Sequence, residues 1–370
     1  MPCVSATIVA KTVPFLADFQ LLPPIPLLVS KQLEIETKRV VNLNRHGLGD
    51  RQVKAFVEGG LSRLAQQGVS VEEVHLADNG IREAATVAAI GEALKSCPKL
   101  QTLDLSNNVI GRDGAVSLAA ALESCPTLQK LTLSKIGVDD KAMSLLINGL
   151  LDHPVLVIMD LSHNELGRTA ATKQVRQNGL TGFTSESLST LIQSGEALQK
   201  LTLSWNSLRG AAATRIALAV EFNSMLTHLE LSRNAFGTGG ADEALSEALR
   251  GHKWLKYLGL AHNGIRERGA VMLGDMLKEN KALEMVVLDG NPIGIRGGRM
   301  ILRALHCFGR FGWKRQVSIT GCNYKFTDDS VEIFDPQRPG GEYSLDLSEP
   351  YQRFVAWELV DLAWCDTAFH

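Results

Sequence analysis

Apolar positions recur along the chain in one pattern, LxxLxLxxNxIG, in which leucines alternate with polar residues ahead of an asparagine. Successive asparagine positions are mostly 28 or 29 residues apart. Such a period indicates a repeat architecture rather than separate globular domains. Eight segments fit closely, beginning at Val71, Leu100, Leu128, Leu156, Leu198, Leu226, Leu255 and Leu283. Two weaker copies begin at Arg39 and Val317, with His46 and Cys322 in the asparagine position, so we expect about ten repeats.

Each repeat contains a strand pattern followed by a helix pattern. Leu103 and Leu105 are two residues apart, so both point to one side of an extended strand and Asp104 points to the other. Over residues 115–122 the apolar residues recur at helical spacing instead. We expect Asn108, between the two, to bond backbone groups of the turn through its side-chain amide. Parallel strands stack about 4.8 Å apart and helices about 8–10 Å apart, so such an array must bend with its strands inside.

This pattern resembles the leucine-rich repeat family over about residues 39–325. The second halves, GxxGAxxLAxAL as in Gly111 to Leu122, look like the ribonuclease-inhibitor-like class of that family. The resemblance implies an α/β fold: a right-handed β/α solenoid, or horseshoe, with a parallel concave sheet, helices on the convex side and non-repeat caps at both ends.

The segments outside the repeats are expected to cover the ends of the array, because a solenoid exposes its core there. Residues 1–38 contain Pro14, Pro23, Pro24 and Pro26 and are read as an extended N-terminal arm or cap, retained rather than cleaved as a signal. Residues 326–370 are read as a C-terminal cap with an amphipathic helix that Ser348 begins. The alternative for each segment is an arm or helix that docks a neighbouring protein.

Composition narrows the classes of partner. The chain has 38 Lys and Arg against 40 Asp and Glu. This balance argues against a positive electrostatic field over the whole molecule that would attract nucleic acid or an anionic membrane. No apolar stretch reaches the roughly 18 residues of a membrane-spanning helix. The six cysteines lack metal-ligand spacing, which is typical of a reducing compartment, and Cys97 and Cys125 are expected to be free, buried thiols of adjacent repeats.

Catalytic and phosphate-binding motifs such as GxxxxGK[ST], HExxH and GxSxG are absent from the sequence. We therefore expect no enzyme, no metal and no cofactor, and a function that lies on the concave face of the sheet.

Three columns of side chains are expected on that face. The residue before each asparagine position forms the turn column, which has a cationic and aromatic centre: Arg45, Asp78, Asn107, Lys135, His163, Trp205, Arg233, His262, Gly290 and Gly321. The residue between the two leucines forms the strand column, which is mildly acidic: Asn42, His75, Asp104, Thr132, Asp160, Thr202, Glu230, Gly259, Val287 and Ser318. Small serines lie between these two columns and would let a partner approach the sheet closely. Trp205 is the one large side chain in the centre of the turn column and would serve as the anchor.

One repeat is irregular and points to the same place. Asn164 and Asn206 are 42 residues apart, and the added residues fall near 168–181, with no Asp or Glu from Leu166 to Ser185. Insertions in solenoids often lie on the binding rim. We expect this loop to leave the strand end beside His163 and to re-enter just before Trp205, next to the cationic column.

The sequence thus predicts an acidic peptide, or the acidic face of a protein, bound between the loop and the turn column. The predicted partner-binding residues are Lys135, His163, Trp205, Arg233, His262, Arg168, Lys173, Arg176, Asp160 and Glu230. The alternatives are a solvated loop and charges such as Asp160 and His163 that only balance each other.

The predicted function is a non-catalytic protein–protein interaction scaffold of the eukaryotic cytoplasm, in a multi-subunit cytoskeletal or ciliary (flagellar, axonemal) assembly. The cellular setting is an analogy with small proteins built from such repeats. One alternative is a GTPase-activating protein of the Ran activator type, although the acidic tail typical of those proteins has no counterpart in LAWCDTAFH. Another is a cytosolic inhibitor or regulator of an enzyme.

Overall fold

The computed structural model describes residues 39–322, with gaps at 62–63, 65, 67, 165, 167–182 and 310–314. The expected N-terminal arm and C-terminal cap lie outside the described residues, and both stay predictions. The chain divides into two compact units, Met1–Asn164 with Glu196–Leu198, and Glu165–Gly195 with Gln199–His370. Each unit is described by itself.

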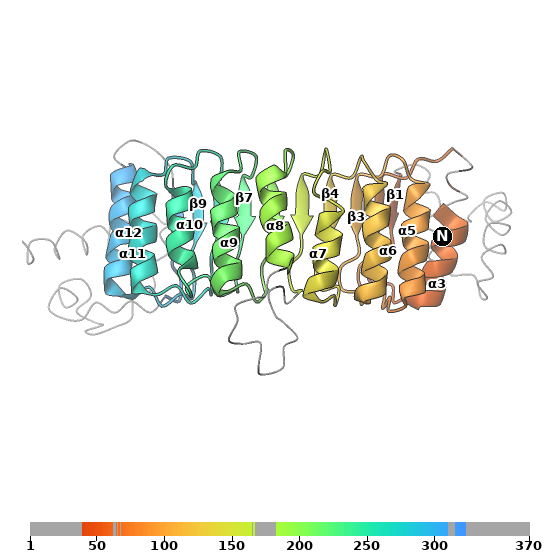
Figure 1. The fold of residues 1–370 in the computed structure, drawn as a ribbon, viewed down its shortest axis with the longest axis horizontal. Coiled ribbons are helices and arrows are strands. Elements are labelled where there is room, and N and C mark those ends of the chain that lie inside the picture. Colours follow the sequence, from red (N-terminus) through yellow and green to blue (C-terminus); the bar gives the residue numbers. More distant parts are fainter. Residues whose placement is uncertain are drawn as a thin grey trace, which may run out of the picture. The chain divides into compact units, whose positions relative to one another are not determined.

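The first unit alternates short parallel strands with helices. Its strands, β1 (Val40–Asn42), β2 (Glu73–His75), β3 (Thr102–Asp104), β4 (Lys130–Thr132) and β5 (Ile158–Asp160), pair in chain order. The helices α3 (Gly49–Ala55), the π-helix η1 (Phe56–Leu61), α5 (Ala84–Lys95), α6 (Gly111–Glu123) and α7 (Asp140–Asn148) cover one face of this sheet (Figure 1).

The second unit repeats the arrangement, beginning with α8 (Phe183–Ser194). Its strands are β6 (Lys200–Thr202), β7 (His228–Glu230), β8 (Tyr257–Gly259), β9 (Met285–Val287) and β10 (Gln316–Ser318), again parallel and paired in chain order. The helices that cover them are α9 (Gly210–Glu221), α10 (Ala241–Arg250), α11 (Glu267–Glu279) and α12 (Gly294–Gly309). The α/β solenoid expected from the sequence is therefore confirmed in each unit.

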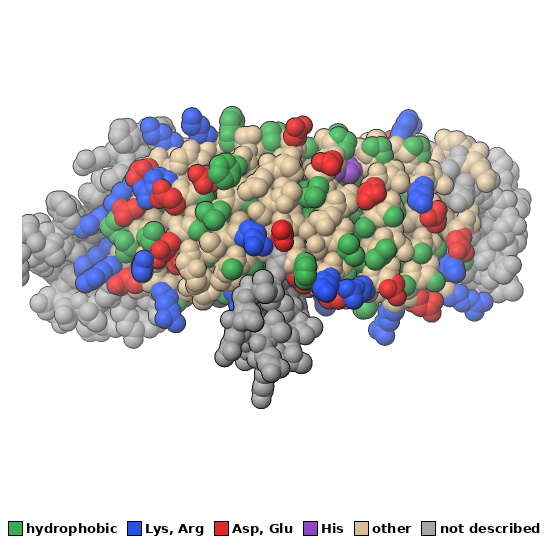
Figure 2. Space-filling view, in the orientation of Figure 1, with side chains coloured by type: hydrophobic (Ala, Val, Ile, Leu, Met, Phe, Trp, Pro, Cys, Tyr) green, Lys and Arg blue, Asp and Glu red, His purple; other side chains and the backbone are tan. Residues whose placement is uncertain are grey.

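The strand pattern explains which sheet face carries the helices. In β3, Leu103 is fully buried between the half-exposed Thr102 and Asp104, and Leu105 just after the strand is buried as well. Both leucines pack beneath the helices, while the flanking residues point to the face without helices, called the open face below. Figure 2 shows the opposite side, where apolar, acidic and basic side chains interleave over the helices.

The repeated asparagines bond the turns as predicted. The Asn108 amide donates to the carbonyls of Leu76 and Leu105, both at 3.0 Å, and its Oδ1 accepts from the backbone of Ile81 at 3.1 Å. A buried amide left without such partners would cost about 1–3 kcal/mol. The same bond to the carbonyl three residues earlier recurs at Asn79, Asn164, Asn206, Asn234 and Asn291. Cys322 takes this place in the last described repeat, where its thiol donates to Leu288 O at 3.2 Å.

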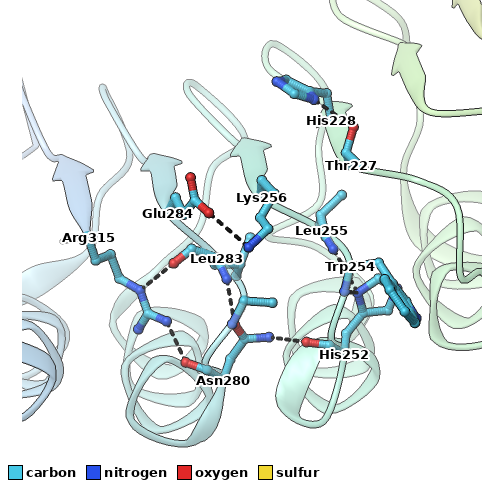
Figure 3. Close-up of polar contacts among 11 residues, drawn as sticks. Thr227, His228, His252, Trp254, Leu255, Lys256, Asn280, Leu283, Glu284 and Arg315 are labelled. Atoms are coloured by element: carbon cyan, nitrogen blue, oxygen red, sulfur yellow. Dashed lines mark hydrogen bonds and ion pairs between the residues drawn. The ribbon is translucent and has the colours of Figure 1, made fainter. Parts of the chain in front are cut away.

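A second ladder of side chains, not foreseen from the sequence, joins the C-terminal helix ends of the second unit (Figure 3). Asn223 donates to the carbonyl of Ile192, and His252 Nε2 donates to Asn223 O at 2.8 Å. Asn280 Nδ2 in turn donates to His252 O at 3.0 Å, and the guanidinium of Arg315 donates to Asn280 O. Each residue thus binds the backbone of the repeat before it and closes a helix end whose carbonyls lack helical partners.

Cys97 and Cys125 are buried free thiols, and burial raises the pKa of both, that of Cys97 to about 11. At neutral pH they are therefore protonated and pack as small apolar groups. Among the described residues no helix is long and apolar enough to cross a bilayer. Within the same part of the chain there is no cluster of three His, Cys, Asp or Glu side chains fit for a metal ion.

Candidate functional site

The turn column shares one backbone conformation. Every non-glycine member from Arg45 to His262 has a positive φ, between 52° and 61°, and Gly290 and Gly321 follow at 65° and 64°. This left-handed conformation costs a residue other than glycine, asparagine or aspartate roughly 1–2 kcal/mol. The glycines, Asn107 and Asp78 are therefore explained by the backbone alone. Lys135, His163, Trp205, Arg233 and His262 are poor choices for this conformation, and a function at the surface would explain them.

Trp205 and Arg233 lie against each other on the open face of the second unit. The Cζ atom of Arg233 is 4.1 Å from the centroid of the indole ring, a cation–π geometry. The backbone of Trp205 donates to Ser232 O at 3.0 Å, so the two turns are also tied through the main chain. Trp205 nevertheless remains 49% exposed. A large aromatic side chain is thus held in place while half of its surface stays open to a partner.

Glu230, in the strand column, is part of an internal network. Its carboxylate accepts from the hydroxyl of Tyr257 at 2.7 Å and from the backbone of Ser232 at 2.8 Å. A Cβ on Gly259 would lie 2.2 Å from this carboxylate, so the glycine makes room for it. Burial and the neighbouring Glu230 raise the pKa of the Tyr257 phenol, and His228 stacks on that ring at 5.8 Å. Glu230 therefore has a structural role on the open face, where it holds Tyr257 and the turn at Ser232 in place.

His262, like Glu230, fills the space that a glycine of the next repeat leaves open. A Cβ on Gly290 would lie 2.3 Å from the imidazole of His262, so the ring covers the glycine of the next repeat. Trp205, Arg233, Glu230 and His262 are thus gathered on one open face, within the second unit.

The other described candidates belong to the first unit. Lys135 and His163 are exposed members of the turn column there. Asp160 accepts from the backbone of Ser162 at 2.9 Å, and the Ser162 hydroxyl donates to that of Ser134 at 2.9 Å. Asp160 thus stabilises its own turn, and its part in binding stays a prediction.

Leu166, the last described residue before the inserted segment, is bonded to the turn that follows Trp205. Arg168, Lys173 and Arg176 lie outside the described residues. Leu166, just before them, donates to Asn206 Oδ1 at 3.0 Å and accepts from the backbone of Ser207 at 2.9 Å. These two partners directly follow Trp205 in sequence, so Leu166 lies next to the turn that carries the tryptophan.

The expected point of re-entry was wrong. The chain resumes at Phe183, the first residue of α8, and α8 and β6 both precede Trp205. The reason is that each repeat needs a helix between its two strands, so extra residues extend the connection from strand to helix.

Charges on the open face of the second unit are balanced. Its strands and turns carry Lys200 and Arg233 against Glu230 and Asp289. Attraction for an acidic partner would therefore have to come from the basic residues of the insertion.

Sequence reasoning missed a second exposed apolar group, at the C-terminal helix ends of the second unit. Phe222, Trp254 and Met225 are 69%, 52% and 37% exposed there. Met225 and Trp254 immediately precede the first leucine of successive repeats, and aligning those repeats would have found them. Figure 3 shows Trp254 beside the ladder residue His252.

Comparison with known proteins agrees with the geometry. The family model described as "Leucine Rich repeat" matches residues 96–119 and 222–243, one segment in each unit. The chain is a leucine-rich repeat protein. Its assignment to the ribonuclease-inhibitor-like class stays a prediction.

Several proteins share this similarity over part of their length. RAN GTPase-activating protein 2 of Arabidopsis thaliana is 28% identical over 110 residues, which are 30% of this chain and 20% of that protein. "NACHT, LRR and PYD domains-containing protein 5" of Mus musculus is 31% identical over 211 residues, 56% of this chain and 17% of that one. The leucine-rich repeat chain therefore spans a fifth or less of the length of these relatives. Among solved structures, the tropomodulin C-terminal domain of Caenorhabditis elegans is similar with a TM-score of 0.34 and 19% identity, over 45% of this chain and 92% of that one, too weak a likeness to carry an argument.

Proposed function

We propose that this leucine-rich repeat protein is a non-catalytic scaffold that binds another protein on the open face of its sheets, with Trp205 as the main anchor. The observation that carries the proposal is the Trp205–Arg233 pair: a tryptophan that is half exposed, yet oriented by a guanidinium and by a left-handed turn. Tryptophan and arginine are the side chains most enriched among residues that dominate binding energy. A preorganised anchor loses little conformational entropy when a partner docks.

The partner is an acidic peptide or an acidic protein face that reaches from Trp205 to the inserted segment. Arg168, Lys173 and Arg176 supply the positive charge that the balanced open face lacks, and Leu166 ties the start of this segment to the turn after Trp205. The scaffold belongs to a multi-subunit assembly of the cytoplasm, of cytoskeletal or ciliary type. That placement is an analogy with other proteins built from such repeats.

Affinity purification of the tagged chain with quantitative mass spectrometry tests this assignment. Trp205→Ala combined with Lys173→Glu is expected to deplete the specific partner at least about tenfold, because both an anchor and a charge are lost. Trp254→Ala is the matched control, since Trp254 is equally exposed but lies at the helix ends. Equal recovery of the partner by the double variant would overturn the proposed surface.

The similarity to RAN GTPase-activating protein 2 favours one second candidate, stimulation of GTP hydrolysis by Ran. A single-turnover assay with Ran loaded with GTP distinguishes the two functions. A rate that rises with the concentration of this chain would make it an enzyme activator in place of a scaffold. Inhibition of an enzyme is a third candidate, which would use the same open face and would show as loss of activity in the partner recovered by purification.

A further inference from the structure

An exposed apolar group, made of Phe222, Met225 and Trp254, lies where two helices of the second unit end. Phe222 and Met225 follow α9, and Trp254 follows α10. The two connections adjoin, because the ring of His252 donates to Asn223 O at 2.8 Å. Within the described part of the chain, neither the Phe222 nor the Trp254 side chain makes a hydrogen bond or a ring contact. Such a group indicates an interaction surface rather than a structural role.

A depression of about 300 Å³ adjoins the apolar group. Its lining includes Lys253, which directly precedes Trp254 in sequence. Gly251 occupies the repeat position of Phe222, and Ala282 occupies that of Trp254, so small residues leave open the space that large ones fill one repeat earlier. A Cβ on Gly251 would meet nothing within 4 Å. The depression can therefore receive a side chain from outside.

The charge of the depression favours a negative group. Its lining contains one glutamate, Glu279, and four basic residues, Arg250, Lys253, Lys256 and Lys281. Three glutamates pair with two of these cations: Glu247 and Glu279 with Arg250, and Glu284 with Lys256 (Figure 3). Four cations thus face three glutamates among the described residues. Lys253 is exposed and forms no ion pair within that part of the chain, so its ammonium group is open to a carboxylate.

We propose that this surface is a second docking site, which binds an acidic segment of a partner protein that carries a large apolar residue beside its carboxylates. The apolar residue packs on Phe222 and Trp254, and a carboxylate enters the depression and meets Lys253. Because Lys253 directly precedes Trp254, one short segment reaches both. A symmetric dimer through this surface is disfavoured, since it would bring two cationic depressions together.

This site is separate from the surface proposed at Trp205. Trp205 lies on the open face of the sheet, whereas the apolar group and the depression lie between the ends of helices and the strands that follow. The two surfaces can therefore hold different partners, and Trp205→Ala and Trp254→Ala each serve as the control for the other.

Selection from a phage-displayed library of random peptides on the immobilised full chain tests the site. The library is first depleted on the variant Gly251→Leu, in which the new side chain fills the depression. The fold should tolerate this change, because φ at Gly251 is −99° and the space above it is open. Peptides that the wild-type chain then retains are expected to combine Asp or Glu with a large apolar residue.

The affinity of one selected peptide, measured by fluorescence anisotropy, assigns the roles. Trp254→Ala and Gly251→Leu should each weaken binding at least about tenfold, because an anchor or its neighbouring space is lost. Lys253→Glu should weaken it about fivefold, and added sodium chloride should weaken it as well. Trp205→Ala and Arg215→Glu should leave it unchanged, since Arg215 is an exposed arginine of α9 in the same unit.

Four results would overturn the proposal. The first is a selection without enrichment of acidic peptides, and the second is equal affinity for Lys253→Glu and the wild-type chain. The third is loss of binding in Trp205→Ala, which would place the peptide on the open face. The fourth is a dimer in sedimentation experiments that Trp254→Ala abolishes, which would assign the surface to a second copy. Thermal unfolding shows whether Gly251→Leu folds, and if it does not, Lys253→Glu replaces it in the depletion step.

Discussion

The guanidinium of Arg233 lies over the indole ring of Trp205, with 4.1 Å between Cζ and the ring centroid. Both residues have φ between 55° and 58°, the left-handed conformation that the turn column shares. Arg233 therefore orients the ring that we propose as the anchor, and the two side chains should act as a pair.

A double-mutant cycle of Trp205→Ala and Arg233→Ala should give a coupling of about 0.5–1 kcal/mol in the free energy of unfolding, the size of a partly exposed cation–π pair. Either single variant already removes this pair, so the double variant loses no further cation–π energy. Chemical denaturation of the four proteins measures it. The control cycle pairs Trp205→Ala with Arg209→Ala, an exposed arginine on the same connection. A coupling within error of zero in the first cycle would show that Arg233 does not hold the ring.

Replacing Lys135 with glycine should stabilise the first unit. Lys135 has φ 55° and is exposed, so glycine relieves backbone strain and removes few contacts. Relief of the strain raises the free energy of unfolding by about 1 kcal/mol, and the greater conformational entropy of glycine in the unfolded chain offsets part of that gain. Lys130→Gly is the control: Lys130 is exposed too but extended in β4, so glycine should destabilise there. The denaturation midpoints should move in opposite directions, and a fall for Lys135→Gly would contradict the strain argument.

His252 should make stability depend on pH. Its ring is buried in the second ladder, where Nε2 donates to Asn223 O and Nδ1 accepts from Leu255 N at 3.1 Å. Burial lowers the pKa of His252 below its ordinary 6.5, and the bond to Asn223 offsets part of that. The unfolded chain therefore binds this proton first as the pH falls, so stability is present above pH 6.5 and is lost below it, toward the folded pKa.

His252→Asn should remove this dependence while keeping the ladder. Asn223 and Asn280, at the same repeat position, make equivalent bonds with Oδ1 and Nδ2. Charged neighbours of His252 are Arg250, Lys253, Lys256, Lys281 and Glu279, which line one depression with it and are the same in both proteins. Denaturation midpoints at pH 5 and pH 8 should differ more for the wild-type chain. An equal difference would assign the pH effect to other groups.

The fold followed from the sequence because its signal is repeated. One LxLxxN segment is weak evidence for a strand and a turn, but ten aligned copies fix which residues face the helices and which the open face. The Asn108 bonds could be predicted because an amide between a strand and a turn has backbone groups of both within reach.

Less of the candidate site than of the fold could be predicted from the sequence. Trp205 and Arg233 lie in the turn column that the sequence singled out, but spacing alone does not show that the guanidinium of Arg233 lies over the indole ring of Trp205. Gly290 and Gly321 are the sequence signal of the left-handed backbone of the column, because glycine adopts a positive φ at little cost. The second ladder uses Asn or His at one repeat position and Arg315 from another position, so it leaves no single residue type for a pattern to detect.

Gly237 should be irreplaceable even by alanine. A Cβ there would lie 2.1 Å from the carbonyl oxygen of Gly264 in the next repeat, and backbone cannot move aside as a flexible side chain does. Gly237→Ala should therefore destabilise the second unit by about 3 kcal/mol or more. Gly251→Ala is the matched control, because a Cβ at Gly251 meets nothing within 4 Å. Thermal unfolding followed by circular dichroism compares them, and similar transitions for both variants would mean that the repeats do not approach this closely.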